Sequence, residues 1–182
     1  MADLSTARRP QVLASSPILR QLPPALRLVL RGNPQVIGAA LTALGLPAGE
    51  APCRASRSQD RAALWLGPDE RLLIGPAEAA AEITDRLHHA LAGTAHSLVE
   101  VSHAFVAFEV LGPRAAATLN AGCPLDLDAA SFPPGMCTRT VLAKAQIVLW
   151  RTGPEVFRVE TARSFAPYVT RLLALAASER AS

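Results

Sequence analysis

Apolar residues follow two periods in turn along the chain from about residue 25. In the segment 26–31 leucines alternate with Arg27 and Arg31, a pattern typical of a half-buried strand. Apolar residues then recur at helical spacing over 34–44, between an Asn-Pro start and a closing Gly45. Further strands are predicted at 54–57, 61–66 and 71–74, and a second helix at about 76–91.

The second half of the chain repeats this order of elements. Strands are predicted at 97–102, 105–111, 138–142, 146–151 and 156–161, with a helix between Gly112-Pro113 and Gly122. The final helix has an apolar stripe of core width, formed by Phe165, Tyr168, Val169, Leu172, Leu173 and Ala176. Each half is therefore a strand, a helix, several strands and a helix. This order favours an α+β fold of two similar halves, with helices covering antiparallel sheets.

Prolines set the first residues apart from this body. We interpret residues 1–24 as a Pro-rich arm without regular structure, because four prolines interrupt it. The arm is either a loose end or a strap along a partner, and removing it should weaken association without unfolding the body. Residues 25–178 are expected to form a single α+β domain, with halves 25–94 and 95–178, followed by a short tail at 179–182. The apolar residues available to a strap are Val12, Leu13, Ile18, Leu19 and Leu22.

Composition excludes several function classes. Half of the 182 residues are hydrophobic, 18% are charged and the formal net charge is +3, as expected for a folded domain rather than a nucleic-acid binder. Aromatic residues make up only 4% of the chain, too few for stacking on single-stranded nucleic acid. The sequence shows neither a secretory signal nor a membrane span. Three widely spaced cysteines favour reduced thiols, and we expect a cytoplasmic protein.

The sequence contains no recognisable metal-binding or phosphate-binding motif. Gly-rich phosphate loops, CxxC and HExxH are absent from the sequence. His88 and His89 are adjacent, so their side chains diverge on a helix. Asp126 and Asp128 lie close to Cys123, but acidic residues in such a loop more often cap turns.

Candidate catalytic groups are equally sparse. Ser102 and His103 are neighbours at a predicted strand end, so they point apart and the imidazole cannot readily activate the hydroxyl. Glu100 and Glu109 lie among apolar residues on predicted strands, where burial would raise a carboxyl pKa but a solvent-facing edge strand explains them as well. We assign no catalytic, cofactor-binding or metal-binding residue, and whether the chain is an enzyme by itself stays open.

An ordered series of short motifs resembles the gamma subunit of heterotetrameric sarcosine oxidase. It spans roughly residues 60–175, and the order of its members is more specific than any one of them. Two positions depart from the pattern: Ala143 stands where Gly is expected, and Arg71 where Trp is frequent. The motifs are Trp65-Leu66-Gly67-Pro68-Asp69-Glu70, Val101-Ser102-His103, Gly112-Pro113-Arg114-Ala115, Ala121-Gly122-Cys123-Pro124-Leu125-Asp126-Leu127, Phe132-Pro133-Pro134-Gly135, Arg139-Thr140-Val141-Leu142-Ala143-Lys144-Ala145, Val148-Leu149-Trp150-Arg151 and Arg163-Ser164-Phe165.

The resemblance implies a small subunit without a cofactor of its own. In that family the complex demethylates sarcosine oxidatively to glycine and passes the one-carbon unit to tetrahydrofolate. FAD, FMN, NAD and zinc belong to the alpha, beta and delta partner subunits. The gamma subunit resembles the amino-terminal part of the aminomethyltransferase fold, in agreement with two α+β halves.

Three hypotheses follow. The first is a non-catalytic gamma subunit that supports assembly of the complex. The second is a stand-alone folate-binding one-carbon protein of the aminomethyltransferase type, with Glu100, Glu109 or Asp126 as the carboxylate for the pterin. The third is a structural domain that forms a homo-oligomer without small ligands.

Overall fold

In the part of the chain that the structure describes, ten strands form two five-stranded sheets in which every pair of neighbours is antiparallel. The computed structural model describes residues 18–48 and 51–179. The first sheet has the order β3 (Ala55–Ser58), β4 (Arg61–Gly67), β5 (Glu70–Pro76), β2 (Ala25–Gly32) and β6 (His96–Glu100). The second sheet has the order β1 (Leu19–Gln21), β7 (Phe105–Leu111), β10 (Val156–Ala162), β9 (Ala145–Gly153) and β8 (Cys137–Leu142).

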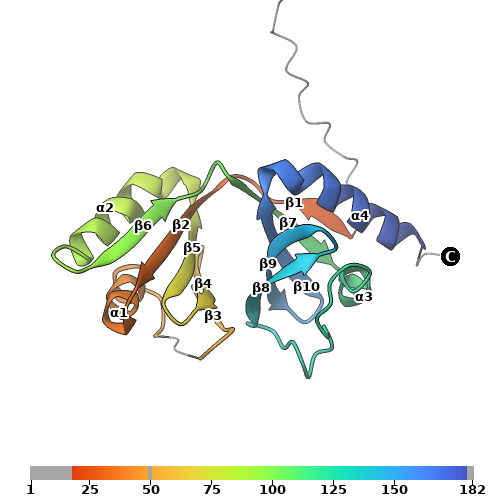
Figure 1. Cartoon of the computed structure of the whole chain (residues 1–182), viewed down its shortest axis with the longest axis horizontal. Coiled ribbons are helices and arrows are strands. Elements are labelled where there is room, and N and C mark those ends of the chain that lie inside the picture. Colours follow the sequence, from red (N-terminus) through yellow and green to blue (C-terminus); the bar gives the residue numbers. More distant parts are fainter. Residues whose placement is uncertain (1–17, 49–50, 180–182) are drawn as a thin grey trace, which may run out of the picture.

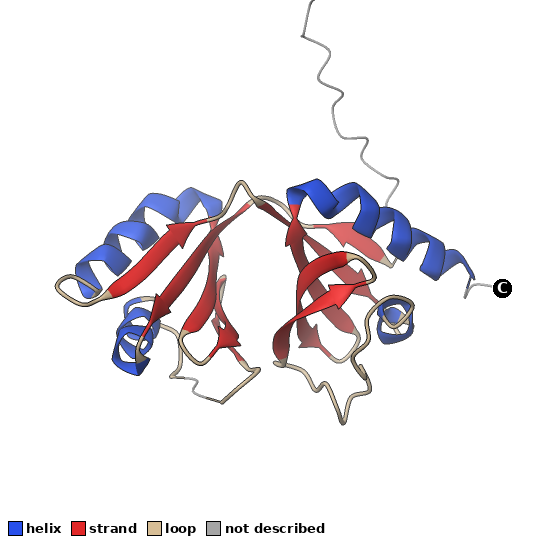
Figure 2. Cartoon of the chain, in the orientation of Figure 1, coloured by secondary structure: helices blue, strands red, loops and turns tan. Residues whose placement is uncertain are grey.

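Helices lie on the outer sides of both sheets, and the inner faces of the sheets turn toward each other (Figures 1 and 2). The first sheet carries α1 (Pro34–Ala43) and α2 (Ala80–Ala90), which follows the short 3₁₀ helix η1 (Ala77–Ala79). The second carries α3 (Ala115–Leu119) and α4 (Ala166–Glu179), which follows η2 (Arg163–Phe165). The α+β fold of two similar halves is thus confirmed. In the part of the chain that the structure describes, no helix is long and apolar enough to cross a membrane.

Three hydrophobic cores hold these layers together. One lies between the first sheet and its helices, one between the second sheet and its helices, and the third between the two sheets. Both faces of strand β9 are apolar because each face packs against a different core. Ile147 and Leu149 contribute to the core under α3 and α4, whereas Val148 and Trp150 contribute to the core between the sheets. Side chains alternate along a strand, so one strand serves two cores.

The halves exchange their first strands. β1 precedes β2 in the chain but pairs with β7 of the second half, and β6 precedes β7 but pairs with β2 of the first half. Leu19 of β1 is buried in the core of the second sheet. The prediction of an arm without regular structure is therefore wrong for Leu19–Gln21, whereas residues 1–17 lie outside the described residues. Removing residues 1–24 would take a strand from the body.

Turns repeat between the halves at the level of single residues. The β3–β4 hairpin turns at Gln59 with a φ of 50°, and the β8–β9 hairpin turns at Ala143 with a φ of 51°. Positive φ at the first central residue of a two-residue hairpin is the setting in which Gly is preferred. The turn of the next hairpin in each half begins with the same dipeptide. It is Gly67-Pro68 between β4 and β5, and Gly153-Pro154 between β9 and β10.

The amphipathic stripe of the last helix is only partly core. Val169, Leu173 and Ala176 are buried as predicted. Phe165 and Tyr168, which the same stripe placed in the core, are 41% and 39% exposed, because the second sheet covers only the side of α4 that carries the first three residues.

Candidate functional site

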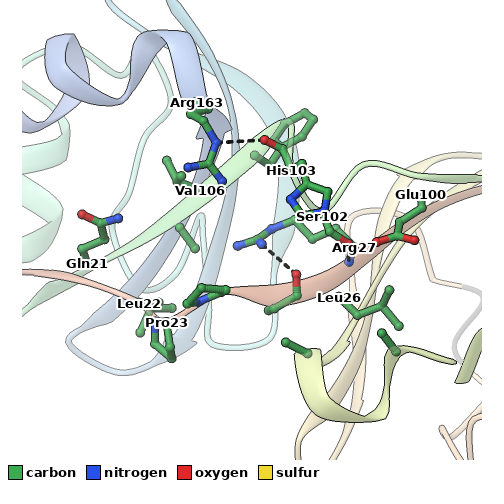
Figure 3. A pocket seen from close by; sticks show the side chains of 16 residues that line it. Gln21, Leu22, Pro23, Leu26, Arg27, Glu100, Ser102, His103, Val106 and Arg163 are labelled. Atoms are coloured by element: carbon green, nitrogen blue, oxygen red, sulfur yellow. Dashed lines mark hydrogen bonds between the residues drawn. The ribbon is translucent and has the colours of Figure 1, made fainter. Parts of the chain in front are cut away.

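A pocket of about 390 Å³ lies where the two chain crossovers between the halves pass each other (Figure 3). Its walls come from the segment 21–27, from the end of β6 and the following turn with the first residues of β7, and from the beginnings of η1, α2 and η2. The lining residues are Gln21, Leu22, Pro23, Pro24, Ala25, Leu26, Arg27, Ala77, Ala80, Glu100, Ser102, His103, Phe105, Val106, Ala107 and Arg163.

Arg27 is the buried cation of this pocket. Its side chain is 2% exposed, and Nε donates to Oε2 of Glu160 on β10 at 2.6 Å. Nη1 donates to the backbone oxygen of Ala25 at 3.1 Å, while Arg158 donates from Nε to the other oxygen of Glu160 at 2.7 Å. The alternation of leucines with Arg27 and Arg31 predicted a half-buried strand. That prediction is wrong at Arg27, because the second sheet covers this face of β2 and supplies a carboxylate.

Ser102 and His103 line the pocket in the turn after β6, and each makes a hydrogen bond that involves a main-chain atom. The Ser102 hydroxyl accepts the Arg27 backbone N–H at 3.0 Å. The His103 carbonyl accepts from Arg163 Nε at 2.9 Å. Within residues 18–48 and 51–179, no hydrogen bond joins the Ser102 hydroxyl to the His103 ring. That the pair does not form a nucleophile and its base stays a prediction.

A second ionic group joins the sheets farther along the interface. Glu70 on β5 accepts from Arg31 of its own sheet at 3.0 Å and from Arg139 of the second sheet at 2.7 Å. Burial by itself would raise the pKa of Glu70, but the hydrogen bond and charge of Arg139, with those of Arg31, lower it below its ordinary value. Glu70 is thus a charged link between the halves.

The two other candidate carboxylates of the strands lie apart. Glu100 is exposed on the edge strand β6 and lines the pocket, as the edge-strand interpretation predicted. Glu109 lies on β7, which is not an edge strand, and it pairs with Arg20 of β1. It lines a different pocket of about 340 Å³ between the sheets, so the two glutamates do not share a site.

The loop acids stabilise turns. Asp126 accepts from the Ser131 hydroxyl at 2.6 Å and from the Asp128 backbone N–H at 3.0 Å, and these bonds lower its pKa. Asp128 accepts from the Ala130 N–H at 2.9 Å. Among the described residues, no group of three or more His, Cys, Asp or Glu side chains is placed to hold a metal ion.

The cysteines are free, as expected, and two of them are buried. Burial raises the pKa of the Cys137 thiol to about 12 and also raises that of Cys123. Cys137 donates weakly to the Trp65 carbonyl at 3.8 Å in the core between the sheets. Both thiols are therefore poor nucleophiles, and their role is packing.

Of the two departures from the family pattern, only Arg71 makes contacts that account for it. Arg71, at the position where Trp is frequent, stacks over Trp65 at 5.9 Å from the ring centroid and donates to the Gly67 carbonyl at 2.6 Å. Ala143, where Gly is expected, has the positive φ that Gly accepts without strain.

Sequence reasoning missed Arg27, Glu160 and Arg163 as members of this site. Arg27 and Glu160 are far apart in the sequence, and each lies on a strand whose polar face looked solvent-exposed. Strand β10 carries Arg158 and Thr161 beside Glu160, so no local signal marked this carboxylate as buried. Together the groups at the pocket hold the two crossover segments in place: the Arg27 guanidinium is paired with Glu160, and the Arg163 guanidinium donates to the His103 carbonyl.

The comparisons with known proteins agree with one another. The family model described as "Sarcosine oxidase, gamma subunit family" matches residues 31–179. The sarcosine oxidase subunit gamma of Corynebacterium sp. (strain U-96) is 34% identical over 165 residues, which are 88% of this chain and 79% of that protein. The corresponding subunit of Arthrobacter sp is 32% identical over 175 residues, 93% of this chain and 84% of that one.

Solved structures give the same result for the fold. A chain of the heterotetrameric sarcosine oxidase from Corynebacterium sp. U-96, in complex with pyrrole 2-carboxylate, is similar with a TM-score of 0.83 and 30% identity over 90% of this chain and 85% of that chain. The glycine cleavage system aminomethyltransferase T from Bartonella henselae shares the fold with a TM-score of 0.64 and 16% identity, over 85% of this chain and 44% of its own. The chain belongs to the sarcosine oxidase gamma subunit family.

Proposed function

We propose that the chain is a non-catalytic subunit that supports assembly of a heterotetrameric sarcosine oxidase. The observation that carries the proposal is the likeness, over 90% of the chain, to a chain of a solved heterotetrameric sarcosine oxidase. Its partners are then the alpha, beta and delta subunits of the same complex, in the cytoplasm.

The internal chemistry of the chain supports a structural role. The carboxylates nearest the interface between the sheets, Glu160 and Glu70, are engaged by arginines of the opposite sheet. Ser102 accepts a backbone N–H that fixes β2 to the crossover. These groups hold the halves together, and none of them is poised as a nucleophile with its base.

In this proposal the reaction chemistry belongs to the partner subunits. They supply FAD, FMN, NAD and zinc, and the complex demethylates sarcosine to glycine with transfer of the one-carbon unit to tetrahydrofolate. This chain contributes a rigid body that the partners bind.

The proposal is tested by affinity purification of the tagged full chain from its native host. Partners are identified by mass, and the visible spectrum of the eluate is recorded. We expect three further chains, two of them large, and a yellow flavin spectrum. The tag fused to an unrelated protein serves as the control.

A colourless eluate that contains this chain alone would contradict the proposal. Titration of that material with tetrahydrofolate then separates the remaining hypotheses: binding by the isolated chain supports a stand-alone folate-binding protein. A symmetric particle that does not bind folate supports a homo-oligomeric structural domain.

A further inference from the structure

Exposed apolar side chains concentrate on the last helix. Five large hydrophobic side chains are exposed among the described residues, and three of them belong to η2 and α4. Phe165 is 41% exposed, Tyr168 39% and Leu175 55%. With the partly buried Leu172 they are spaced three, four and three residues apart, which places all four on one side of the helix. We call these four residues the α4 stripe.

The fold does not require this stripe. Strand β5, η1 and the start of α2 have the same lengths and spacing as β10, η2 and the start of α4, so their positions correspond. Ile83 and Leu87 of α2 are buried where α4 buries Val169 and Leu173. The positions that match Tyr168, Leu172 and Leu175 are the exposed Glu82, Arg86 and His89.

On α2 that side of the helix is a solvated surface. Glu82 and Arg86 form an ion pair at 2.7 Å one helical turn apart. The same arrangement of sheet and helix therefore packs with a charged outer helix surface on α2. Packing of the fold does not explain why the outer surface of α4 is apolar.

The α4 stripe has the composition of an interface centre. The rings of Phe165 and Tyr168 are in edge contact, with centroids 6.5 Å apart. Leu172 packs partly against the core under α4, which fixes the stripe to the body. Aromatic residues on a firm support are the typical anchors of protein–protein contacts, because they bury a large area at a small entropic cost.

The charges beside the stripe select the kind of partner. Arg171 is exposed next to it and makes no ion pair or hydrogen bond with the part of the chain that the structure describes. Arg163, at its start, is exposed and also basic. A second copy of this chain would bring arginine toward arginine. The segment 1–17 is a poor occupant as well, since it carries Arg8 and Arg9 against one acidic residue, Asp3.

We infer that the α4 stripe is the surface through which this chain docks onto another polypeptide, one whose contact surface is apolar and edged by acidic residues. The inference rests on the proposed function, and its partner is a subunit of the proposed complex. Arg171 and Arg163 then meet carboxylates at the rim, where charge pairs speed association and fix orientation.

Affinity purification from the native host, with tagged full-length variants, tests the inference. We expect Leu175→Glu to lower the recovery of partner chains at least tenfold, because it places a charge in the apolar contact, at the most exposed residue of the stripe. Arg171→Glu should lower it severalfold and more strongly at low salt. Leu175→Met retains an apolar side chain and should recover partners as the unchanged chain does.

Val99→Glu is the matched control. Val99 is 51% exposed on the edge strand β6, close to the 55% exposure of Leu175, and it lies in the first sheet, whereas α4 covers the second. Thermal unfolding of each isolated variant checks that the body is intact; Leu175 is exposed, so its melting temperature should stay within a few degrees of the unchanged chain.

The outcomes separate the inference from the function on which it rests. If the unchanged chain recovers partners and Leu175→Glu recovers them equally well, the α4 stripe is not the docking surface, although the proposed function stands. If the unchanged chain recovers no partner, both proposals fail together. If the isolated chain sediments as a dimer that Leu175→Glu dissociates, the occupant is a second copy and the inference is overturned.

Discussion

The two halves of the chain share their strand order and their hairpin turns, yet their closing helices present opposite surfaces to solvent. Helix α2 exposes Glu82, Arg86 and His89, whereas α4 exposes Tyr168 and Leu175 at matching positions. On these two helices the buried positions match, Ile83 and Leu87 with Val169 and Leu173, and the exposed positions differ. An internal repeat thus acts as its own control: it shows which residues the architecture needs and which serve something outside the chain.

The largest expected effect concerns the ion pair that joins the halves. Arg27→Met leaves Glu160 buried without that partner, and we expect a loss of about 3 to 5 kcal/mol in the free energy of unfolding, measured with urea. The double variant Arg27→Met with Glu160→Leu should recover most of this loss, since both charges are then absent from the interior. A double variant as unstable as the sum of its two single variants would contradict this account.

The exchanged strands give the next comparison. Leu19 of β1 is buried in the core of the second sheet, and Leu98 of β6 is partly buried against the core of the first sheet. Leu19→Ala should cost about 2 to 3 kcal/mol and Leu98→Ala about 1 kcal/mol, measured by urea unfolding. Equal losses would mean that the two exchanged strands contribute alike.

The Glu70 cluster predicts a pH dependence of stability. Because the pKa of Glu70 is lowered in the folded chain, its stabilisation is present above the ordinary glutamate pKa of about 4.3 and is lost as the pH falls through the folded value. Glu70→Gln should cost about 1 kcal/mol at pH 7, since Arg31 and Arg139 are half exposed. Urea unfolding at pH 7 and at pH 3 should show the difference between the two proteins shrinking at the acidic pH. A difference independent of pH would rule out the charge as its origin.

The smallest effect concerns the repeated turn. Ala143→Gly relieves the strain of a positive φ but adds entropy to the unfolded chain, so we expect a net gain of about 0.5 to 1 kcal/mol. Gln59→Gly should give a gain of the same sign in the other half. Thermal unfolding measures both, and a loss at either position would show that its side chain makes a contact outweighing the strain.

Periodicity, together with the Gly-Pro and Gly signals that start and end elements, was enough to predict the described helices and strands except β1. The segments from 26 to 176 carry either alternating or helical apolar patterns, and the Gly-Pro pairs mark their turns. Strand β1 has only three residues, too few for an alternating pattern, and neighbouring prolines argue against regular structure. Its partner β7 lies far along the chain, so no local sequence pattern could predict the pairing of β1 with β7.

The site was less predictable than the fold. Amphipathicity predicts which side of a strand or helix carries a polar residue such as Arg27 or an apolar residue such as Tyr168. It does not predict what covers that side. Arg27 is covered by a second sheet that appears much later in the sequence, and Tyr168 is left open although its spacing matches the core. In both cases the missing information was tertiary.

The reciprocal strand exchange also sets the order of events during synthesis. Strand β1 is synthesised before β2, yet it has no place to pair until β7 has been made, by which time the whole first half has emerged. The second sheet then needs β10, almost at the end of the chain, to lie between β7 and β9. Pairings this distant along the sequence fold slowly, and an unpaired β1 is an open edge during the wait. We therefore expect the newly made chain to spend longer exposed to aggregation and chaperones than its small size suggests.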